Sequence, residues 1–134
     1  MTSSYNLWWG NGVGILVDAY STNKTFSHDT IFDNHTMGMI VGPGGEAIIK
    51  SSLITHNGRW GLQVQSRGRV SISHTGLPSN SSGAISGTAS RKAINTRPAG
   101  YMTLDSSHAS FLRIKAGSYQ YTAGPSGTPI GARY

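Results

Sequence analysis

Asparagine recurs in this chain at an interval of 23 residues, and that interval restricts the possible folds more than any other feature of the sequence. The asparagines are Asn11, Asn34, Asn57 and Asn80. Large apolar residues keep the same interval in three further sets: Phe26, Ile49 and Ile72; Trp8, Ile31, Ile54 and Leu77; and Leu16, Met39, Leu62 and Ile85. A period of this length indicates similar units stacked on one another.

The apolar residues within each unit form short alternating clusters, which are typical of β-strands. A Gly-apolar-x-Val string recurs at residues 14–17, 38–41 and 61–64, so one residue is gained or lost between the first two units. Glycine and asparagine between the clusters indicate turns. The chain has 18 glycines and only 12% charged residues, which disfavours a helical bundle. The sequence therefore predicts an all-β fold of about four 23-residue coils, each with two or three short strands.

In such a stack, equivalent residues of successive coils lie above one another at the usual strand spacing of ~4.8 Å. We expect Phe26, Ile49 and Ile72 to fill the interior. We expect the four asparagines to form a structural ladder, because their amides can bond to the coils above and below and because asparagine tolerates the left-handed conformation of a sharp turn. Four separate, solvated turn asparagines are the alternative.

Two stretches of the chain resemble coils of a known superfamily. Ile31-Phe32-Asp33-Asn34-His35 is followed by residues 38–41, and Leu53-Ile54-Thr55-His56-Asn57-Gly58 is followed by residues 61–64. These strings look like coils of the pectate-lyase-like right-handed parallel β-helix superfamily, which includes pectate lyases, polygalacturonases, alginate epimerases and bacteriophage tailspikes. The likeness covers roughly residues 5–87 and implies a right-handed parallel β-helix, while its coils recur across many chemistries.

The period ends near Gly87, and the remaining residues change character. Short apolar runs at 101–104, 111–114 and 119–122, with turn signals between them, predict a small C-terminal antiparallel β element. We therefore divide the chain into β-helix coils at 1–87 and a C-terminal β cap or oligomerisation region at 88–134. The second part is too small to hold much core alone, so we expect it to cover the last coil, to contact neighbouring subunits, or both.

The plan of coils followed by a β region is most like the C-terminal part of a phage tailspike or tail fibre protein. The likeness implies a homotrimer in which residues 88–134 help to trimerise or terminate the fibre. The first coil shows no cap, so we expect a piece of a longer polypeptide, or a small subunit that stacks on another β-helix. Whether Met1 is native or added stays open.

The formal net charge of +6 predicts attraction to an anionic partner, such as nucleic acid, an acidic polysaccharide or a membrane surface. The basic residues are scattered, so a solvated surface with few acids is an equal alternative. No cysteine is present, which excludes a disulfide scaffold and thiolate metal sites. No apolar stretch approaches the ~20 residues of a membrane span, so we expect no membrane insertion.

Catalysis has few candidate residues. Asp29 and Asp33 flank Ile31 and are expected to point outward on one coil, and His56 stands where Asp33 does one coil later. These three are weak catalytic candidates, because aspartate beside a turn more often serves local hydrogen bonds. No complete active site is visible, so enzymatic activity stays open. We expect no metal site, since no acids stack on adjacent coils, and no cofactor.

Exposed aromatic residues beside a cation suggest sugar binding. Trp8 falls in the interior set, but Trp9 and Trp60 alternate away from it, and Arg59 adjoins Trp60. We therefore predict a carbohydrate-binding patch of Trp9, Arg59 and Trp60, with packing on a neighbouring subunit as the alternative.

Three functional hypotheses follow. The first is a C-terminal fragment of a phage tailspike or tail fibre that binds a bacterial surface polysaccharide, for which an anionic polymer is one candidate, and binds no nucleic acid. The second is a fragment of a polysaccharide lyase or hydrolase whose catalytic residues lie mainly upstream. The third is a purely structural virion subunit. The first places the chain in the virion tail; a secreted bacterial protein is the alternative.

Overall fold

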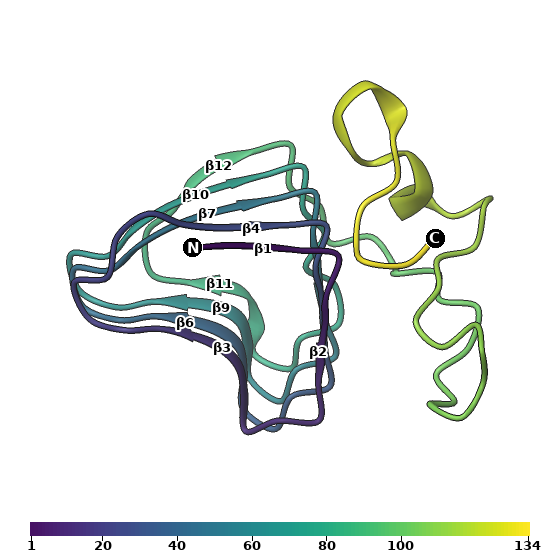
Figure 1. The fold of residues 1–134 in the computed structure, drawn as a ribbon, viewed down its shortest axis with the longest axis horizontal. Helices are drawn as coiled ribbons and strands as arrows, with labels where there is room; N and C mark the ends of the chain where they lie inside the picture. Colours follow the sequence, from purple (N-terminus) through teal and green to yellow (C-terminus); the bar gives the residue numbers. More distant parts are fainter.

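The protein, as a computed structural model that describes residues 1–134, is an all-β solenoid of about four parallel coils (Figure 1). Three parallel sheets run along it: a five-stranded sheet of order β1-β4-β7-β10-β12, a four-stranded sheet of order β11-β9-β6-β3, and a three-stranded sheet of order β2-β5-β8. The chain passes through the five-, three- and four-stranded sheets in turn, so neighbouring strands of one sheet belong to successive coils. The predicted fold class is confirmed.

The strands are short, and tight corners separate them. Their bounds are β1 Thr2–Ser4, β2 Leu7–Trp9, β3 Val13–Val17, β4 Lys24–Ser27, β5 Thr30–Phe32, β6 Met37–Val41, β7 Glu46–Lys50, β8 Leu53–Thr55, β9 Trp60–Val64, β10 Arg69–Ser73, β11 Gly83–Ser86 and β12 Ser90–Lys92. Two 3₁₀ helices follow, η1 Tyr119–Thr122 and η2 Pro125–Gly127.

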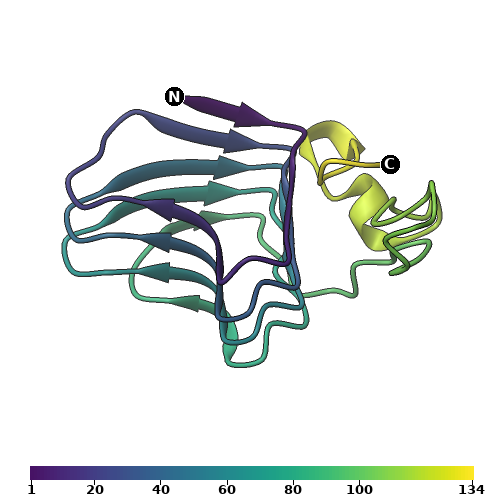
Figure 2. The same cartoon turned by 60° about the horizontal axis from the view of Figure 1, so that its bottom comes forward.

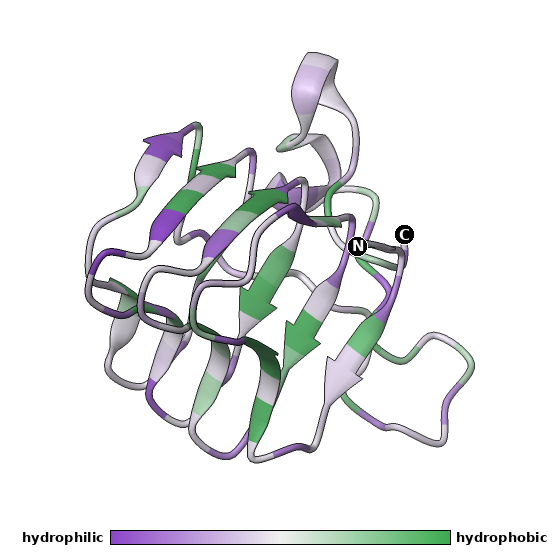
Figure 3. Ribbon diagram, turned by 60° about the vertical axis from the view of Figure 1, so that its left-hand side comes forward, coloured by the Kyte–Doolittle hydropathy of each residue, from purple (hydrophilic) through white to green (hydrophobic).

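The interior contains the predicted apolar columns. Phe26, Ile49 and Ile72 pair in register and are 2%, 1% and 1% exposed. Trp8 pairs with Ile31 and packs against the same core. Figure 3 shows hydrophobic and hydrophilic bands alternating along the strands, as expected when one face of each sheet lines the core.

One member of the 23-residue apolar sets lies outside the core. Leu16 pairs with Ile40 and is 60% exposed, while Ile15 pairs with Met39 and points inward. The reason is that β3 and β6 pair at an interval of 24, whereas the other strand pairs have an interval of 23, apart from β10 and β12, which pair at 19. The first coil regains its register before Lys24, which pairs with Ala47 at 23. A one-residue shift in a strand exchanges its inner and outer side chains.

Asn34, Asn57 and Asn80 form a side-chain ladder, whereas the prediction included Asn11 as well. Asn34 Nδ2 donates to Asn57 Oδ1 at 3.0 Å, and Asn57 Nδ2 donates to Asn80 Oδ1 at 2.9 Å. The same two oxygens accept the backbone N–H groups of Asn34 and Asn57. Asn11 joins only through its backbone N–H, which Asn34 Oδ1 accepts at 3.1 Å, and its own side chain is exposed.

The expected conformation of these asparagines was wrong. None of them has a positive φ; the residue before each one does. These residues are Gly10, Asp33, His56 and Ser79, with φ of 70°, 50°, 59° and 61°. They form the corner between the three- and four-stranded sheets, which we call the second corner. The left-handed residue turns the chain, and in Asn34, Asn57 and Asn80 the side chain that follows points inward and bonds to a neighbouring coil.

Glycines make room for this ladder. A Cβ atom on Gly38 would lie 2.6 Å from Gly61 O and 2.7 Å from Asn57 Nδ2. Gly14 and Gly61 meet the ladder in the same way. The Gly-apolar-x-Val string therefore begins with glycine because the ladder occupies the space of a side chain.

The C-terminal part differs from the prediction in three respects. Parallel pairing continues past residue 87, because β12 pairs with β10 and Asn95 bridges Gly76. The predicted strands at 101–104 and 111–114 are reduced to one antiparallel and one parallel bridge, and 119–122 is a 3₁₀ helix. Leu112 has a φ of 56°, which interrupts extended backbone.

Residues 96–134, which we call the C-terminal segment, lie beside the solenoid and not over its last coil (Figures 1 and 2). They cover the outer face of the three-stranded sheet, where Phe32 and Leu53 pack against Phe111, Ile114 and Ile130. The expected position over the end of the stack was wrong, because the segment packs its apolar side chains on Phe32 and Leu53, which point outward from β5 and β8.

Candidate functional site

The structure separates the three residues predicted as a catalytic group. Asp33 and His56 occupy equivalent positions of successive coils at the second corner, and Asp33 N–H donates to Thr55 O at 3.2 Å. Asp33 is exposed and His56 is half-buried. Asp29 lies before β5, at the opposite end of that strand from Asp33, and is fully buried. The expectation that both aspartates point outward was therefore wrong.

Asp29 belongs to a second polar ladder, at the corner between the five- and three-stranded sheets, which we call the first corner. Its Oδ1 accepts the N–H of Asn6 at 2.8 Å, and its Oδ2 accepts the hydroxyl of Ser3 at 2.9 Å. Its own N–H donates to Ser52 Oγ, and Ser52 N–H donates to Thr75 Oγ1. Burial raises the pKa of Asp29, while the hydrogen bonds from Asn6 and Ser3 oppose that rise. The hydrogen bonds of this carboxyl group link its coil to the preceding one, at Ser3 and Asn6.

The predicted sugar-binding residues are not brought together either. Trp9 ends β2 in the first coil, and its ring meets Phe111 of the C-terminal segment edge to face at 5.1 Å. Trp60 begins β9 in another sheet, where its ring lies over Gly83. Arg59 beside it is exposed. Trp9 thus packs one part of its ring on a segment distant in sequence while staying 45% exposed, and it lies in a different sheet and a different coil from Trp60.

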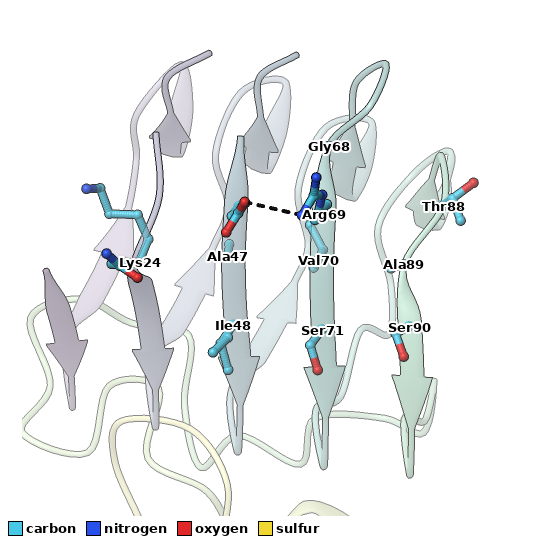
Figure 4. Close-up of a pocket in the computed structure, with 12 residues that line it drawn as sticks. Lys24, Ala47, Ile48, Gly68, Arg69, Val70, Ser71, Thr88, Ala89 and Ser90 are labelled. Atoms are coloured by element: carbon cyan, nitrogen blue, oxygen red, sulfur yellow. Dashed lines mark ion pairs between the residues drawn. The ribbon is translucent and has the colours of Figure 1, made fainter. Parts of the chain in front are cut away.

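A surface groove lies elsewhere, over the five-stranded sheet (Figure 4). Its volume is about 420 Å³, and strands β4, β7, β10 and β12 form its floor. It is lined by Asn23, Lys24, Glu46, Ala47, Ile48, Gly68, Arg69, Val70, Ser71, Thr88, Ala89 and Ser90. A smaller hollow beside it, lined in part by Gln65, Ser66 and Arg67, shares Gly68 and Thr88 with the groove.

The outer face of this sheet carries polar side chains in rows along the solenoid. One row consists of Thr25, Ile48, Ser71 and Ser90, which are paired in register on successive strands. A second row pairs Ser27, Lys50, Ser73 and Lys92. Each step along a row is one coil, or about 4.8 Å, and every position of the two rows except Ile48 carries a hydroxyl or amino group.

Every one of these four strands brings a cation to this face. Lys24 and Arg69 lie at the starts of β4 and β10, while Lys50 and Lys92 lie at the ends of β7 and β12. Glu46 is the single acid among the groove residues, and its Oε1 lies 3.8 Å from Arg69 Nη1. Both side chains of this pair are largely exposed, so it contributes little to stability. The face has an excess of positive charge.

Sequence reasoning missed the groove and the cations around it because Lys24 and Arg69, which line it, and Lys50 and Lys92, further along the strands, lie in four different strands and do not stack on adjacent coils. Lys24, Lys50, Arg69 and Lys92 alternate between the two ends of their strands, so no fixed interval relates them. For Lys50, Arg69 and Lys92 the signal was the outward set of each strand, which becomes readable once Ile49 and Ile72 are assigned to the interior. Lys24 has the parity of the buried Phe26 and pairs with Ala47, so this signal does not include it.

No group of three or more histidine, aspartate or glutamate side chains is arranged to hold a metal ion. No helix has the length and apolar character needed to cross a membrane. Comparison of the chain with models of protein families, with curated proteins and with solved structures found no match.

Proposed function

We propose that this chain is a glycan-binding solenoid that attaches to an anionic bacterial surface polysaccharide. We further propose that it acts in a homotrimeric phage tailspike or tail fibre, as its likeness to pectate-lyase-like β-helices suggests. The observation that carries the binding proposal is the cationic, hydroxyl-lined groove over the five-stranded sheet.

The groove suits an extended polymer. Its floor repeats along the solenoid, so a chain of similar sugar units meets similar groups at each coil. Ser71 and Ser90 are exposed and provide hydroxyls, and Ile48 provides an apolar side chain that is 49% exposed. Sugar rings present hydroxyl groups at their edges and C–H groups on their faces, and this surface offers partners for both.

The charge favours an acidic glycan. Lys50 and Lys92 are separated by two coils in one row, or about 9.6 Å at the usual strand spacing. Acidic groups on alternate sugars of a polymer would recur at a similar distance. No aromatic side chain belongs to either row, which disfavours single-stranded nucleic acid, because its bases bind by stacking on aromatic rings.

The groove favours binding over hydrolysis. Glycoside hydrolysis usually employs two carboxyl groups within ~10 Å of each other. Glu46 is the only carboxyl group of the groove, and it lies beside Arg69.

The test is to measure binding of purified acidic and neutral bacterial polysaccharides by isothermal titration calorimetry, and to assay the same mixtures for released reducing ends. The double variant Lys24→Ala/Arg69→Ala is expected to lose about tenfold in affinity for an acidic glycan, since two exposed ionic contacts contribute about 1.4 kcal/mol together. Wild-type affinity should fall as salt is raised.

Two controls make the result specific. Lys115→Ala removes an exposed cation of the C-terminal segment and should leave affinity unchanged. Trp60→Ala tests the patch predicted from the sequence, and the groove proposal expects wild-type binding. Retention of full affinity by the double variant would refute the groove, and reducing-end release would refute a purely binding role. A sedimentation mass near one 14.2 kDa chain would refute the trimer.

A further inference from the structure

The three-stranded sheet has an apolar outer face that the C-terminal segment covers. Phe32 and Leu53 point outward from β5 and β8 and are 6% and 0% exposed because the segment packs on them. Thr55 bonds through its hydroxyl to the Tyr101 hydroxyl at 2.8 Å. Gly131 N–H donates to Ser51 O at 2.8 Å, which ties the segment to the first corner.

The segment has no hydrophobic core of its own. One buried cluster joins Ala99, Ile114 and Ile130 to Leu53, and the other joins Phe111 and Leu112 to Phe32. Its regular structure is limited to two bridges and two short 3₁₀ helices. Segments with few regular hydrogen bonds and a shared core open at a lower free energy than the rest of a protein. The segment is therefore the part most readily released.

His56 lies at the edge of this interface. Its ring centroid is 5.2 Å from that of Phe32 and 6.3 Å from that of Tyr101, which belongs to the segment. Its Nδ1 is buried and has no hydrogen-bond partner. A protonated imidazole carries an N–H on both nitrogens, so protonation would place a charged donor at Nδ1 with no acceptor.

From this geometry we propose that the C-terminal segment is an acid-sensitive latch, which protonation of His56 releases from the three-stranded sheet. The proposal is independent of glycan binding. Release would expose Phe32 and Leu53 as a strip along the solenoid, so the protein would present an apolar face in acid that it hides at neutral pH.

The charges around His56 support this direction. Burial lowers the pKa of His56, and Asp33, one coil earlier, opposes that effect in part. From the segment it faces Tyr101, whose pKa burial raises, so that this phenol stays neutral. A docked pKa below 6.5 means that docking is favoured above pH 6.5 and weakens as pH falls below it.

Protonation of the two titratable residues at the first corner, His28 and Asp29, has opposite effects on the stability of the fold. Burial lowers the pKa of His28, with Asp29 opposing and Lys50 assisting, and its ring stacks on Tyr5 at 4.7 Å. Its protonation therefore also opposes the neutral-pH structure. Burial raises the pKa of Asp29, so its protonation as pH falls favours the folded state.

The test is an NMR titration of the isotopically labelled chain from pH 7.5 to 4.5. We expect a pKa for His56 below 6.5. We also expect the hydrogen-exchange protection factors of two amides to fall at least tenfold between pH 7.5 and pH 5. These amides are Gly131 and Ile114, whose N–H donates to Arg133 O. Amides of the four-stranded sheet should stay protected.

His56→Asn is the decisive variant, because asparagine tolerates the φ of 59° and cannot be protonated in this range. It should keep the segment docked at pH 5. His35→Asn, at an exposed position of the same corner, is the matched control and should behave as wild type. Equal protection of the segment at pH 7.5 and pH 5, or a His56 pKa of 6.5 or above, would overturn the proposal. The wild-type titration decides this even if His56→Asn fails to dock.

Discussion

Replacing Asn57 with alanine removes the middle residue of the asparagine ladder, and the structure allows its cost to be worked out group by group. Asn57 is fully buried. Its Oδ1 accepts the backbone N–H of Asn34 and one hydrogen of the Asn34 amide, both at 3.0 Å. Its Nδ2 donates to Asn80 Oδ1 at 2.9 Å and to Ile31 O at 3.4 Å.

After the substitution, most of these partners keep another bond. Asn34 Nδ2 still donates to Trp8 O, and Asn80 Oδ1 still accepts the N–H of residue 57. The backbone N–H of Asn34 keeps none and is buried. An unpaired buried donor costs about 1–3 kcal/mol, and each lost bond of ordinary strength about 1 kcal/mol. We expect Asn57→Ala to lower the free energy of unfolding by about 3 kcal/mol.

Asn11→Ala is the matched control, because Asn11 contributes only its backbone N–H to the ladder. Its cost should stay below about 0.5 kcal/mol. Urea unfolding followed by circular dichroism measures both variants, and the melting temperature of Asn57→Ala should fall by about 10 °C. If the two variants differ by less than about 0.5 kcal/mol, the ladder does not stabilise the stack and the reasoning fails.

Three further substitutions test other parts of the structure. Gly38→Ala should cost about 1–3 kcal/mol in urea unfolding because its Cβ would strike the ladder, whereas Gly12→Ala, with nothing within 4 Å, should cost almost nothing. Asp29→Asn keeps the accepting Oδ1 and removes a charge that burial disfavours. It should therefore raise the urea midpoint at pH 7, and it should abolish the gain in stability that the wild type shows as pH falls through the raised pKa. Ile15→Gln should cost about 3 kcal/mol because it buries an amide in the core, while Leu16→Gln at its exposed neighbour should stay within about 0.5 kcal/mol; equal effects would contradict the register.

The period alone was enough to predict the solenoid, its interior columns and the ladder. Stacked coils repeat the same surroundings, so residues such as Phe26, Ile49 and Ile72 must satisfy the same packing requirement at the same interval. The period could not predict which side chains point inward where one coil has an extra residue. The interval of 24 between β3 and β6 exchanged the roles of Ile15 and Leu16.

Only the tertiary structure decided which polar side chains share a surface. The positive φ of His28 turns the chain immediately before Asp29, and the carboxyl enters the wall of the stack, where the sequence suggested an outward position. Trp9 packs edge to face on Phe111, more than a hundred residues further along the chain, in a segment with no repeat to place it. The repeat in the sequence determines how each coil folds, because equivalent residues of neighbouring coils are in contact throughout the stack. The contacts of the non-repeating C-terminal segment depend instead on where apolar surface remains once the coils have formed.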